Sequence, residues 1–382
     1  MERVLYSSEH KDFGESFQAF LTDYAAAQYA QWERDEIVPH EFFTEAGRRG
    51  FMAFEADEQY GGVGIRDFRF NSMLADVGYG MGLAGAVGGI TLHNDVCLPY
   101  FTLYCNEEQR ERWLPGIVNG DYLAAVAMTE PGAGSDLAGI ATRAVKTEGG
   151  YVINGAKTFI TNGINSDLVI TVVRTDASDR HGGLSLLIVE RGTDGFARGR
   201  NLQKVGLHSA DTAELFFEDV FVPDENLLGE EGMGFRYLTA NLPQERLSVA
   251  MCAMAVARTV LAQTLDYVKT RNAFGKPIGS FQNTRFVLAE LATEVEIATV
   301  YVDRCIVALN EDKLSAVDAA MAKWWTTELQ GRVVDRCLQL HGGYGYMLEY
   351  PVARAFIDSR VTRIYAGTNE IMKEIVGRSL GL

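Results

Sequence analysis

The 382-residue sequence lacks several features that mark common classes of protein. No apolar run approaches the roughly 18–20 uncharged residues that a membrane-spanning helix needs. The opening stretch, MERVLYSSEHKDFGESF, has neither the apolar core of a signal peptide nor the Arg-rich, acid-poor character of a transit peptide. We therefore expect a cytoplasmic protein without a membrane span, with a bacterial source as the simplest interpretation.

Cysteine and histidine are scarce, and neither forms a metal-binding pattern. The five cysteines have no CxxC spacing, and the six histidines are scattered. In a chain without a secretion signal, such cysteines are expected to be reduced and buried as small apolar residues. The sequence predicts no metal site.

Positive charge is also in short supply. Thirty-five Lys and Arg residues face 51 Asp and Glu residues, which gives a formal net charge of −16. A field of this sign repels phosphate, so nucleic acid and anionic membranes are not expected partners. A phosphate-bearing ligand would need local basic groups and backbone N–H donors.

The chain contains three stretches that differ in their pattern of apolar and polar residues. About the first 120 residues have the spacing of amphipathic helices, as in ESFQAFLTDYAAAQYAQWERD, and helical periodicity returns from Gly232 onward. Between them lie strand-like segments, including DLVITVVRT, LSLLIVE and TAELFFEDVFVP. Asn154-Gly155 in YVINGAKTFITNG predicts a hairpin turn. Helices, then strands, then helices predict an α+β fold rather than alternating βαβ units.

One glycine motif, Gly80 to Gly85, matches the pattern G-x-G-x-x-G of dinucleotide-binding proteins. That motif requires a preceding strand and a following helix. The preceding FRFNSMLADV looks helical, so we interpret these glycines as sites of close helix packing.

The stretch AVAMTEPGAGSDLAGIATRA lies where helical texture gives way to strands. Thr129 and Ser135 offer hydroxyls, and Gly132 and Gly134 allow a ligand to approach the backbone closely. This loop could also be a polar connection between domains, but its position suits a ligand-binding seam.

Five motifs, MTEPGAGSD, NGAKTFITNG, TRNAFGKPIGSFQ, LQLHGGYGY and YAGTNEIMKEIVGR, occur in the order and spacing of acyl-CoA dehydrogenases. The resemblance covers essentially the whole chain and is closest to the long-chain members, enzymes of fatty acid β-oxidation. It implies a helical N-terminal domain (1–123), a β-barrel or sandwich middle domain (124–229) and a C-terminal four-helix domain (230–382).

The resemblance also implies FAD as the cofactor. The isoalloxazine ring would lie near Met128, Thr129, Phe159 and Thr161, and Ser135 would lie between cofactor and substrate. Across a subunit boundary, Arg271, Phe274 and Gln282 would reach the pyrophosphate and adenosine parts of a neighbour's FAD. The full set of residues implied to bind the cofactor is Val126, Met128, Thr129, Gly134, Ser135, Phe159, Thr161, Arg271, Phe274, Gln282, Gln339, Leu340, Gly342, Gly343, Thr368 and Glu370. His341 is interpreted as a packing residue.

The catalytic base needs a separate argument, because many family members carry it as a glutamate where this chain has Ala366. A subset, including the long-chain and isovaleryl-CoA enzymes, carries it on a helix in a Glu-Arg pair like Glu245-Arg246. If a helix begins at Pro243, Glu245 lies at one end of an apolar stripe, which favours a raised pKa. On its own chemistry, Glu245 is better explained as a first-turn glutamate that complements the helix dipole. The resemblance favours Glu245 over Glu370, which it places beside the cofactor.

Ala366 keeps a role in this interpretation, because its backbone N–H can donate to the thioester carbonyl. Arg246 is expected to position the site and compensate charge. The residues expected to bind substrate are Ser135, Arg236, Leu242, Glu245, Arg246, Ala366 and Gly367.

The sequence therefore predicts an FAD-dependent dehydrogenase that converts long-chain or branched acyl-CoA to trans-2-enoyl-CoA and passes electrons to an electron-transfer flavoprotein. The resemblance implies a homotetramer, built as a dimer of dimers. An acyl-CoA oxidase and a catalytically silent relative are the alternatives. The apolar residues of the pocket do not fix the chain length of the substrate.

Overall fold

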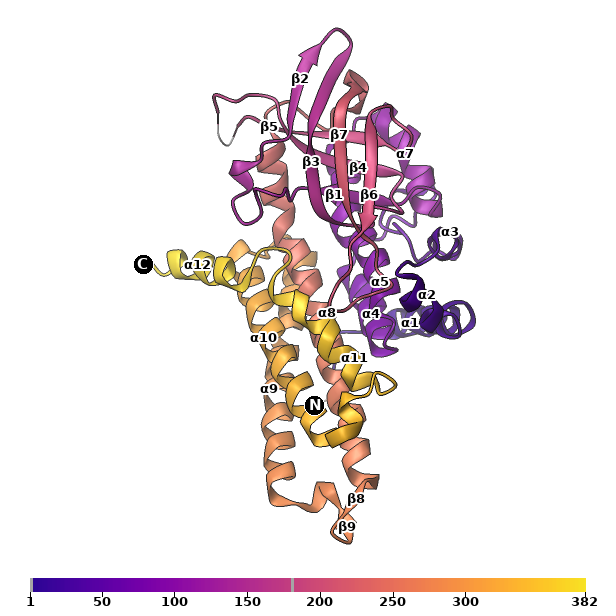
Figure 1. The fold of residues 1–382 in the computed structure, drawn as a ribbon, viewed down its shortest axis with the longest axis vertical. Helices are drawn as coiled ribbons and strands as arrows, with labels where there is room; N and C mark the ends of the chain where they lie inside the picture. Colours follow the sequence, from indigo (N-terminus) through magenta and orange to yellow (C-terminus); the bar gives the residue numbers. More distant parts are fainter. Residues whose placement is uncertain (1–2, 180–181) are drawn as a thin grey trace.

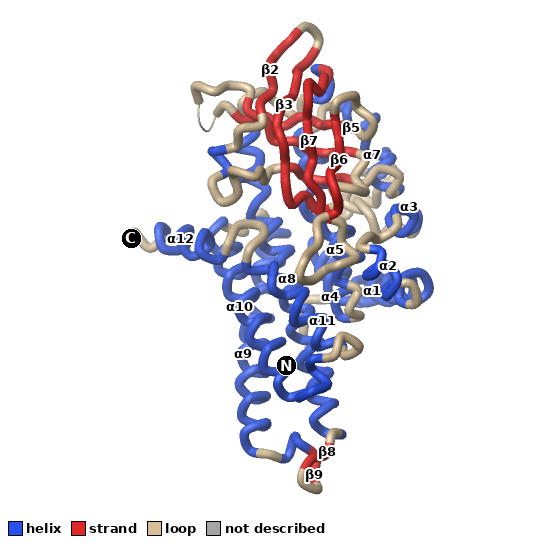
Figure 2. Tube along the Cα trace, in the orientation of Figure 1, coloured by secondary structure: helices blue, strands red, loops and turns tan. Residues whose placement is uncertain are grey.

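The computed structural model describes residues 3–179 and 182–382. Helices occupy both ends of the chain and strands occupy the middle, which confirms the α+β prediction (Figure 1). Coloured by secondary structure, the strands between residues 124 and 223 gather at one end of an elongated molecule, the long helices extend from them, and a short hairpin lies at the far end of these helices (Figure 2).

The N-terminal part is a cluster of short helices around an aromatic core. Phe17, Phe20, Phe42 and Phe51 are almost fully buried there, and Phe20 stacks on Phe42 at 5.5 Å between ring centroids. The helices are α1 (Ser8–Leu21), α2 (Tyr29–Asp35), α3 (His40–Arg48), α4 (Phe68–Gly80), α5 (Ala84–Thr91), α6 (Leu98–Tyr104) and α7 (Glu107–Asn119). No strand precedes the Gly80–Gly85 motif in the described residues, and a Cβ at Gly85 would lie 2.1 Å from Ser209 Oγ. The glycine there permits close packing.

The middle part is a seven-stranded sheet within the described residues. Its strands run in the order β1-β4-β2-β3-β7-β6, with β5 paired to β4. β1 is parallel to β4, whereas β3 pairs with β2 and β7 in antiparallel fashion. The strands are β1 (Ala124–Ala127), β2 (Arg143–Thr147), β3 (Gly150–Thr161), β4 (Leu168–Arg174), β5 (Leu184–Glu190), β6 (Phe196–Asn201) and β7 (Thr212–Pro223).

The predicted hairpin turn at Asn154-Gly155 is wrong. Both residues lie inside β3, where the register against β7 shifts between Ile153 and Gly155. The Asn154 side chain exchanges two hydrogen bonds with Asp219 of β7, at 2.9 and 3.0 Å, and so stabilises a bulge instead of a turn. The chain reverses earlier, between β2 and β3, at Glu148 and Gly149, whose φ of 77° suits glycine.

The C-terminal part is a helical bundle around α8 (Gly234–Thr270). Its apolar core includes Leu247, Met254, Leu291, Leu329 and Val333. The other elements are β8 (Asn272–Ala273), β9 (Lys276–Pro277), α9 (Gln282–Asn310), α10 (Ala316–His341), α11 (Pro351–Asp358) and α12 (Asn369–Ser379). The β8–β9 hairpin connects α8 to α9 at the end of the bundle far from the sheet (Figure 1).

The prediction that a helix begins at Pro243 is wrong, because α8 begins at Gly234 and Pro243 lies inside it. Proline ends or kinks a helix when nothing else holds it, since it lacks the N–H that bonds to the carbonyl four residues earlier. Packing overrides that local preference here: Leu238, Leu247 and Ala250 are fully buried on either side of Pro243.

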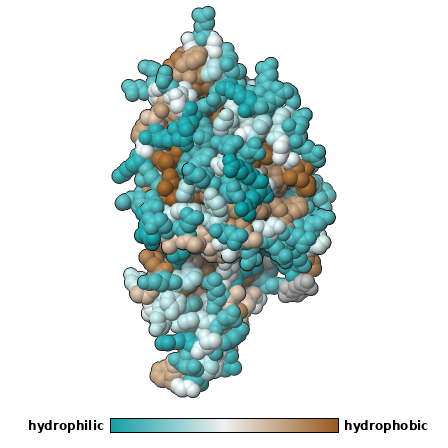
Figure 3. Space-filling model, turned by 90° about the vertical axis from the view of Figure 1, so that its right-hand side faces the viewer, coloured by the Kyte–Doolittle hydropathy of each residue, from teal (hydrophilic) through white to brown (hydrophobic). Residues whose placement is uncertain are grey.

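By length and composition α8 could cross a membrane, since an 18-residue window has a mean hydropathy of 1.4. However, 67% of that window is buried within the protein, as expected for the core helix of a bundle. On the face drawn in Figure 3, hydrophilic residues predominate and hydrophobic residues form separate small groups. All five cysteines are free and buried, as predicted.

Candidate active site

Glu245 lies in the first half of α8, and its side chain is only 6% exposed. Its Oε1 atom accepts a hydrogen bond of 3.1 Å from the hydroxyl of Tyr100, which lies on α6. Burial raises the pKa of Glu245 to about 7, while the Tyr100 hydrogen bond and the charge of Arg246 act in the opposite direction. A carboxyl group in this state can gain or lose a proton near neutral pH.

Two buried donors close to Glu245 on α8 have no hydrogen-bond partner among the described residues. They are Arg246 Nε and Asn241 Nδ2. Burial lowers the pKa of Arg246, and the neighbouring Glu245 raises it. Buried donors without partners are uncommon and costly, so a ligand that accepts hydrogen bonds is expected here.

The loop that contains Ala366 lies beside Arg246. A Cβ atom added at Gly367 would lie 3.9 Å from a terminal nitrogen of Arg246. Ala366 and Gly367 have φ values of 53° and 88°, so both adopt the left-handed conformation that is unfavourable for alanine. The Ala366 N–H has no backbone hydrogen bond within the described residues. It remains a half-buried donor on a turn that ends at Thr368, the N-cap of α12.

A second part of the site lies between β1 and β3. The N–H of Thr158 donates to the carbonyl of Thr129 at 2.9 Å. Beneath this contact, the fully buried Lys157 pairs with Glu130 at 2.8 Å and donates to the carbonyl of Met128 at 3.1 Å. These bonds hold Met128 and Thr129 against Lys157 and Thr158, the two residues of β3 that precede Phe159.

Phe159 is the exposed member of this group. Its φ is 59° and its side chain is 67% exposed, which is unusual for a large aromatic residue on an ordered strand. The hydroxyls of Thr129, Ser135 and Thr161 have no partner among the described residues. A Cβ at Gly132 or Gly134 would meet no atom within 4 Å. An open aromatic face, unpaired hydroxyls and a roomy glycine loop fit a flat ring with polar edges, such as a flavin.

Other predicted cofactor residues lie at the opposite end of the bundle. Arg271 lies over the Tyr344 ring, 5.3 Å from its centroid, so it is close to the turn that follows α10. Phe274 has a φ of 51° and is 95% exposed in the β8–β9 hairpin. Gln282 begins α9, and the stretch from Gln339 through Leu340 to Gly342 and Gly343 ends α10. Within one chain these elements lie at the end of the bundle far from β3, the strand that contains Phe159 (Figure 1). His341 stacks on Tyr267 at 4.2 Å, as a packing residue would.

The remaining predicted residues differ in exposure. Arg236 is exposed on α8 and Leu242 is half-buried one turn before Glu245, while Val126 is half-buried on β1. Glu370 is exposed in the first turn of α12. Its exposure contrasts with the burial of Glu245, which has the environment that raises a carboxyl pKa.

Sequence analysis missed residues that hold α8 in place, because they are distant in the chain. Asp95, on the π-helix η3 (Leu92–Cys97), is 1% exposed and accepts hydrogen bonds from Ser248 Oγ and, at 2.8 Å, from Asn71 Nδ2. Its backbone carbonyl accepts a bond of 2.8 Å from Gln244 Nε2. These hydrogen bonds anchor α8 at Gln244 and Ser248, on either side of Glu245. The local feature that marks Asp95 is the π-helix η3, and sequence periodicity does not reveal a π-helix.

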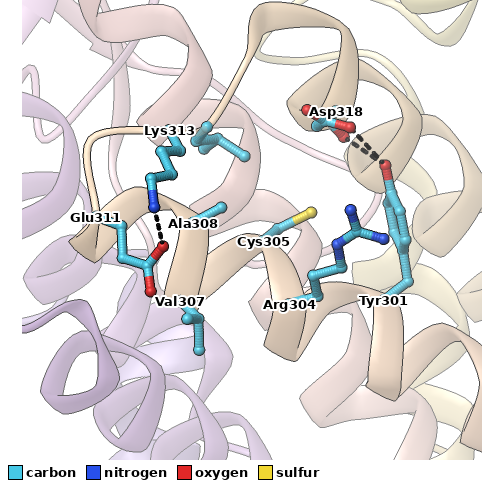
Figure 4. A pocket seen from close by; sticks show the side chains of 9 residues that line it. Tyr301, Arg304, Cys305, Val307, Ala308, Glu311, Lys313 and Asp318 are labelled. Atoms are coloured by element: carbon cyan, nitrogen blue, oxygen red, sulfur yellow. Dashed lines mark hydrogen bonds and ion pairs between the residues drawn. The ribbon is translucent and has the colours of Figure 1, made fainter.

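Two surface pockets lie elsewhere on the bundle. One, of about 260 Å³, lies between α9 and α10 and is lined by Tyr301, Arg304, Cys305 and Asp318 among others (Figure 4). The other, of about 570 Å³, is a mainly apolar groove between α8 and α9. Neither includes a predicted catalytic residue.

Comparisons with known proteins agree with this architecture. Profiles described as the N-terminal, middle and C-terminal domains of acyl-CoA dehydrogenase match residues 7–121, 125–220 and 232–381. The long-chain specific acyl-CoA dehydrogenase of Sus scrofa is 43% identical over 99% of this chain and 88% of its own length. A solved acyl-CoA dehydrogenase from Geobacillus kaustophilus is 49% identical, with 99% of each chain covered and a TM-score of 0.96. A chain of the structure described as the electron transferring flavoprotein of Acidaminococcus fermentans is 32% identical, with 98% of each chain covered and a TM-score of 0.93.

The fold and the site thus define a flavin-dependent oxidoreductase. The chain belongs to the acyl-CoA dehydrogenase family. This confirms the predicted family, enzyme class and cofactor, FAD.

Proposed function

We propose that this protein dehydrogenates acyl-CoA thioesters between the α and β carbons, with Glu245 as the base. The observation that carries the proposal is the buried Glu245 carboxyl, held by Tyr100 beside a loop whose Ala366 N–H has no hydrogen-bond acceptor among the described residues. The product is a trans-2-enoyl-CoA. FAD, when bound, accepts the hydride from the β carbon.

Proton removal is the task of Glu245. The ionised carboxylate takes the α proton, and burial makes it a stronger base than an exposed glutamate. Tyr100 holds the carboxylate in one orientation through its hydrogen bond. Arg246 keeps a positive charge next to the carboxyl group while the carboxyl group gains or loses its proton.

Stabilisation of negative charge falls to the loop. As the α proton leaves, charge accumulates on the thioester oxygen, and a backbone donor aimed at that oxygen lowers the barrier. The Ala366 N–H serves this purpose without a side chain, so replacing a glutamate by alanine here does not remove the donor. Ser135, Arg236, Leu242 and Gly367 complete the substrate contacts.

Two groups of residues would hold FAD. Val126, Met128, Thr129, Gly134, Ser135, Phe159 and Thr161 line the flavin end, with Thr368 and Glu370 nearby in the cofactor's hydrogen bonding. Arg271, Phe274, Gln282 and the Gln339–Gly343 segment bind a neighbouring subunit's FAD in a dimer of dimers. The division of the chain at 123 and 229, the cytoplasmic location and an electron-transfer flavoprotein as acceptor belong to the same proposal. A chain with this fold in a solved structure whose description names an electron transferring flavoprotein supports the last of these.

Long-chain or branched acyl-CoA is the proposed substrate class, supported by the long-chain specific relative from Sus scrofa. Purified holoenzyme mixed anaerobically with a panel of acyl-CoAs tests the function. We expect bleaching of the flavin absorbance and one equivalent of 2-enoyl-CoA per flavin with at least one member of the panel. A flavin that stays oxidised with every straight and branched acyl-CoA would contradict the proposal. Hydrogen peroxide formed with oxygen alone, at the dehydrogenase rate, would instead indicate an oxidase.

A further inference from the structure

Lys323, on α10, is a buried cation that the mechanism above does not use. Its side chain is 0% exposed. Nζ donates to the carbonyl of Gly367 at 2.8 Å and to Asn369 Oδ1 at 3.0 Å. Lys323 therefore reaches across 44 residues of chain to the turn that follows Ala366.

No carboxylate of the described residues forms an ion pair with Lys323. Glu328 and Glu370 influence it only from a distance, and Arg246 adds a second positive charge nearby. Burial, and next Arg246, lower the pKa of Lys323 to about 8. Burying a cation without a paired anion is costly, and placing two cations together adds to the cost.

The hydrogen bonds of Lys323 fall on a strained part of the backbone. Ala366 and Gly367 are both left-handed, a conformation that persists only where surrounding contacts enforce it. The Asn369 side chain, which also receives a bond from Lys323, donates to Thr327 and Glu328 at 3.0 Å each. The turn is thus tied to α10 on both sides of Thr368.

We propose that Lys323 is a positioning residue for the reaction: it holds the Ala366–Gly367 turn by the Gly367 carbonyl and supplies a buried positive charge next to the group that stabilises the substrate anion. This inference rests on the proposed function. It gives this buried lysine a role, because the negative charge that would pair with it arises during catalysis on the thioester oxygen.

A substrate analogue that can lose its α proton but has no β hydride tests the proposal. In a 3-thiaacyl-CoA, sulfur replaces the β carbon, so Glu245 takes the α proton and the reaction stops at the enolate. An enolate next to an oxidised flavin gives a long-wavelength absorption band, whose intensity is titrated against pH. The variants are Lys323→Met, Lys323→Gln and Lys323→Arg, with Lys373→Met as control, because Lys373 is an exposed lysine on α12 near the same loop.

We expect Lys323→Met and Lys323→Gln to raise the pH midpoint of the band by about one unit or more, since a lost positive charge disfavours the enolate. Lys323→Arg and Lys373→Met should stay near the wild-type midpoint. An unchanged midpoint in a neutral variant that keeps its FAD would overturn the proposal. If Lys323→Met does not fold, Lys323→Gln, which keeps a donor for Gly367, decides the question.

Failure of the proposed function gives a different result. Glu245→Gln should form no band at any pH if Glu245 is the base. A wild-type band in Glu245→Gln would contradict the base assignment, whatever the Lys323 variants do.

Discussion

Three influences set the protonation state of Glu245. Burial favours the neutral carboxyl, while the Tyr100 hydrogen bond and the Arg246 charge favour the carboxylate, and the pKa that results is about 7. The ordinary value for a glutamate is about 4.3. This environment suits the residue to the proposed role of a base at neutral pH.

Tyr100→Phe tests this balance. A hydrogen bond from a neutral hydroxyl stabilises the ionised carboxylate, so its loss should raise the pKa of Glu245 further above its ordinary range. The pH midpoint for flavin reduction by acyl-CoA should therefore move upward, by roughly one unit. The rate at neutral pH should fall, and the plateau at high pH should change less.

Tyr104→Phe is the matched control, because the Tyr104 ring stacks on Tyr237 at 4.0 Å and makes no hydrogen bond to Glu245. Single-turnover rates from pH 6 to 9 provide the measurement. Coincident profiles for Tyr100→Phe and wild type would show that the hydrogen bond has no part in setting the base.

At the scale of elements, the fold depends on close crossings that only glycine allows. Gly47 on α3 faces the backbone at the end of α7, where a Cβ atom would lie 2.3 Å from the carbonyl carbon and oxygen of Asn119. The neighbouring atoms belong to the backbone, so they cannot rotate away as a side chain could.

We expect Gly47→Ala to lower the free energy of unfolding by about 2 kcal/mol or more, because α3 must move away from α7. Gly377→Ala, in α12, is the control: it is also a helical glycine, but its Cβ would meet nothing within 4 Å. It should be neutral or slightly stabilising, since alanine favours helix. Thermal denaturation of both holoenzymes provides the comparison, and equal midpoints would contradict the packing argument.

Elements were predictable where local pattern and packing agree. Helical spacing in the N-terminal and C-terminal thirds, the apolar runs of β4 and β5 and the alternating run of β7 indicated the correct structures. Asn154-Gly155 and Pro243 led to wrong predictions, because each has a strong local preference that tertiary contacts override. Asp219 stabilises a bulge at Asn154-Gly155 in place of a turn, and the buried core keeps Pro243 inside α8.

The candidate site shows the same division. Glu245, Ala366 and the flavin-side residues were candidates from the sequence because they lie in motifs. Tyr100, Asp95 and Lys323 were not, because each acts on a residue between 44 and 153 positions away, and no short pattern encodes such a contact.

At the scale of the whole molecule, the predicted cofactor residues form two groups at opposite ends of the bundle. Phe159 lies at the sheet end, and Arg271 and Phe274 lie beyond the end of α8 (Figure 1). With a net charge of −16, the protein needs a local cation such as Arg271 to bind a pyrophosphate. We expect each complete site to combine the sheet end of one subunit with the hairpin end of another.

Mixed oligomers test this arrangement. Glu245→Gln and Arg271→Ala subunits should each be nearly inactive alone, the second because it retains little FAD. After the two are unfolded together and refolded with FAD, about a quarter of the sites should combine an intact Glu245 with a neighbour's Arg271. Flavin reduction by acyl-CoA measures the recovered activity. No recovery in oligomers shown to contain both subunits would contradict a shared site.

The most direct test of the central claim, that Glu245 supplies the base, is the rate of flavin reduction by acyl-CoA in Glu245→Gln, followed by anaerobic stopped-flow absorbance. Glutamine keeps the size of the side chain and can still accept a hydrogen bond from Tyr100, but it cannot take a proton. We predict that the variant binds FAD and acyl-CoA normally and that its flavin reduction is slower by about 10³-fold or more. Reduction within tenfold of the wild-type rate would contradict the account and place the base elsewhere.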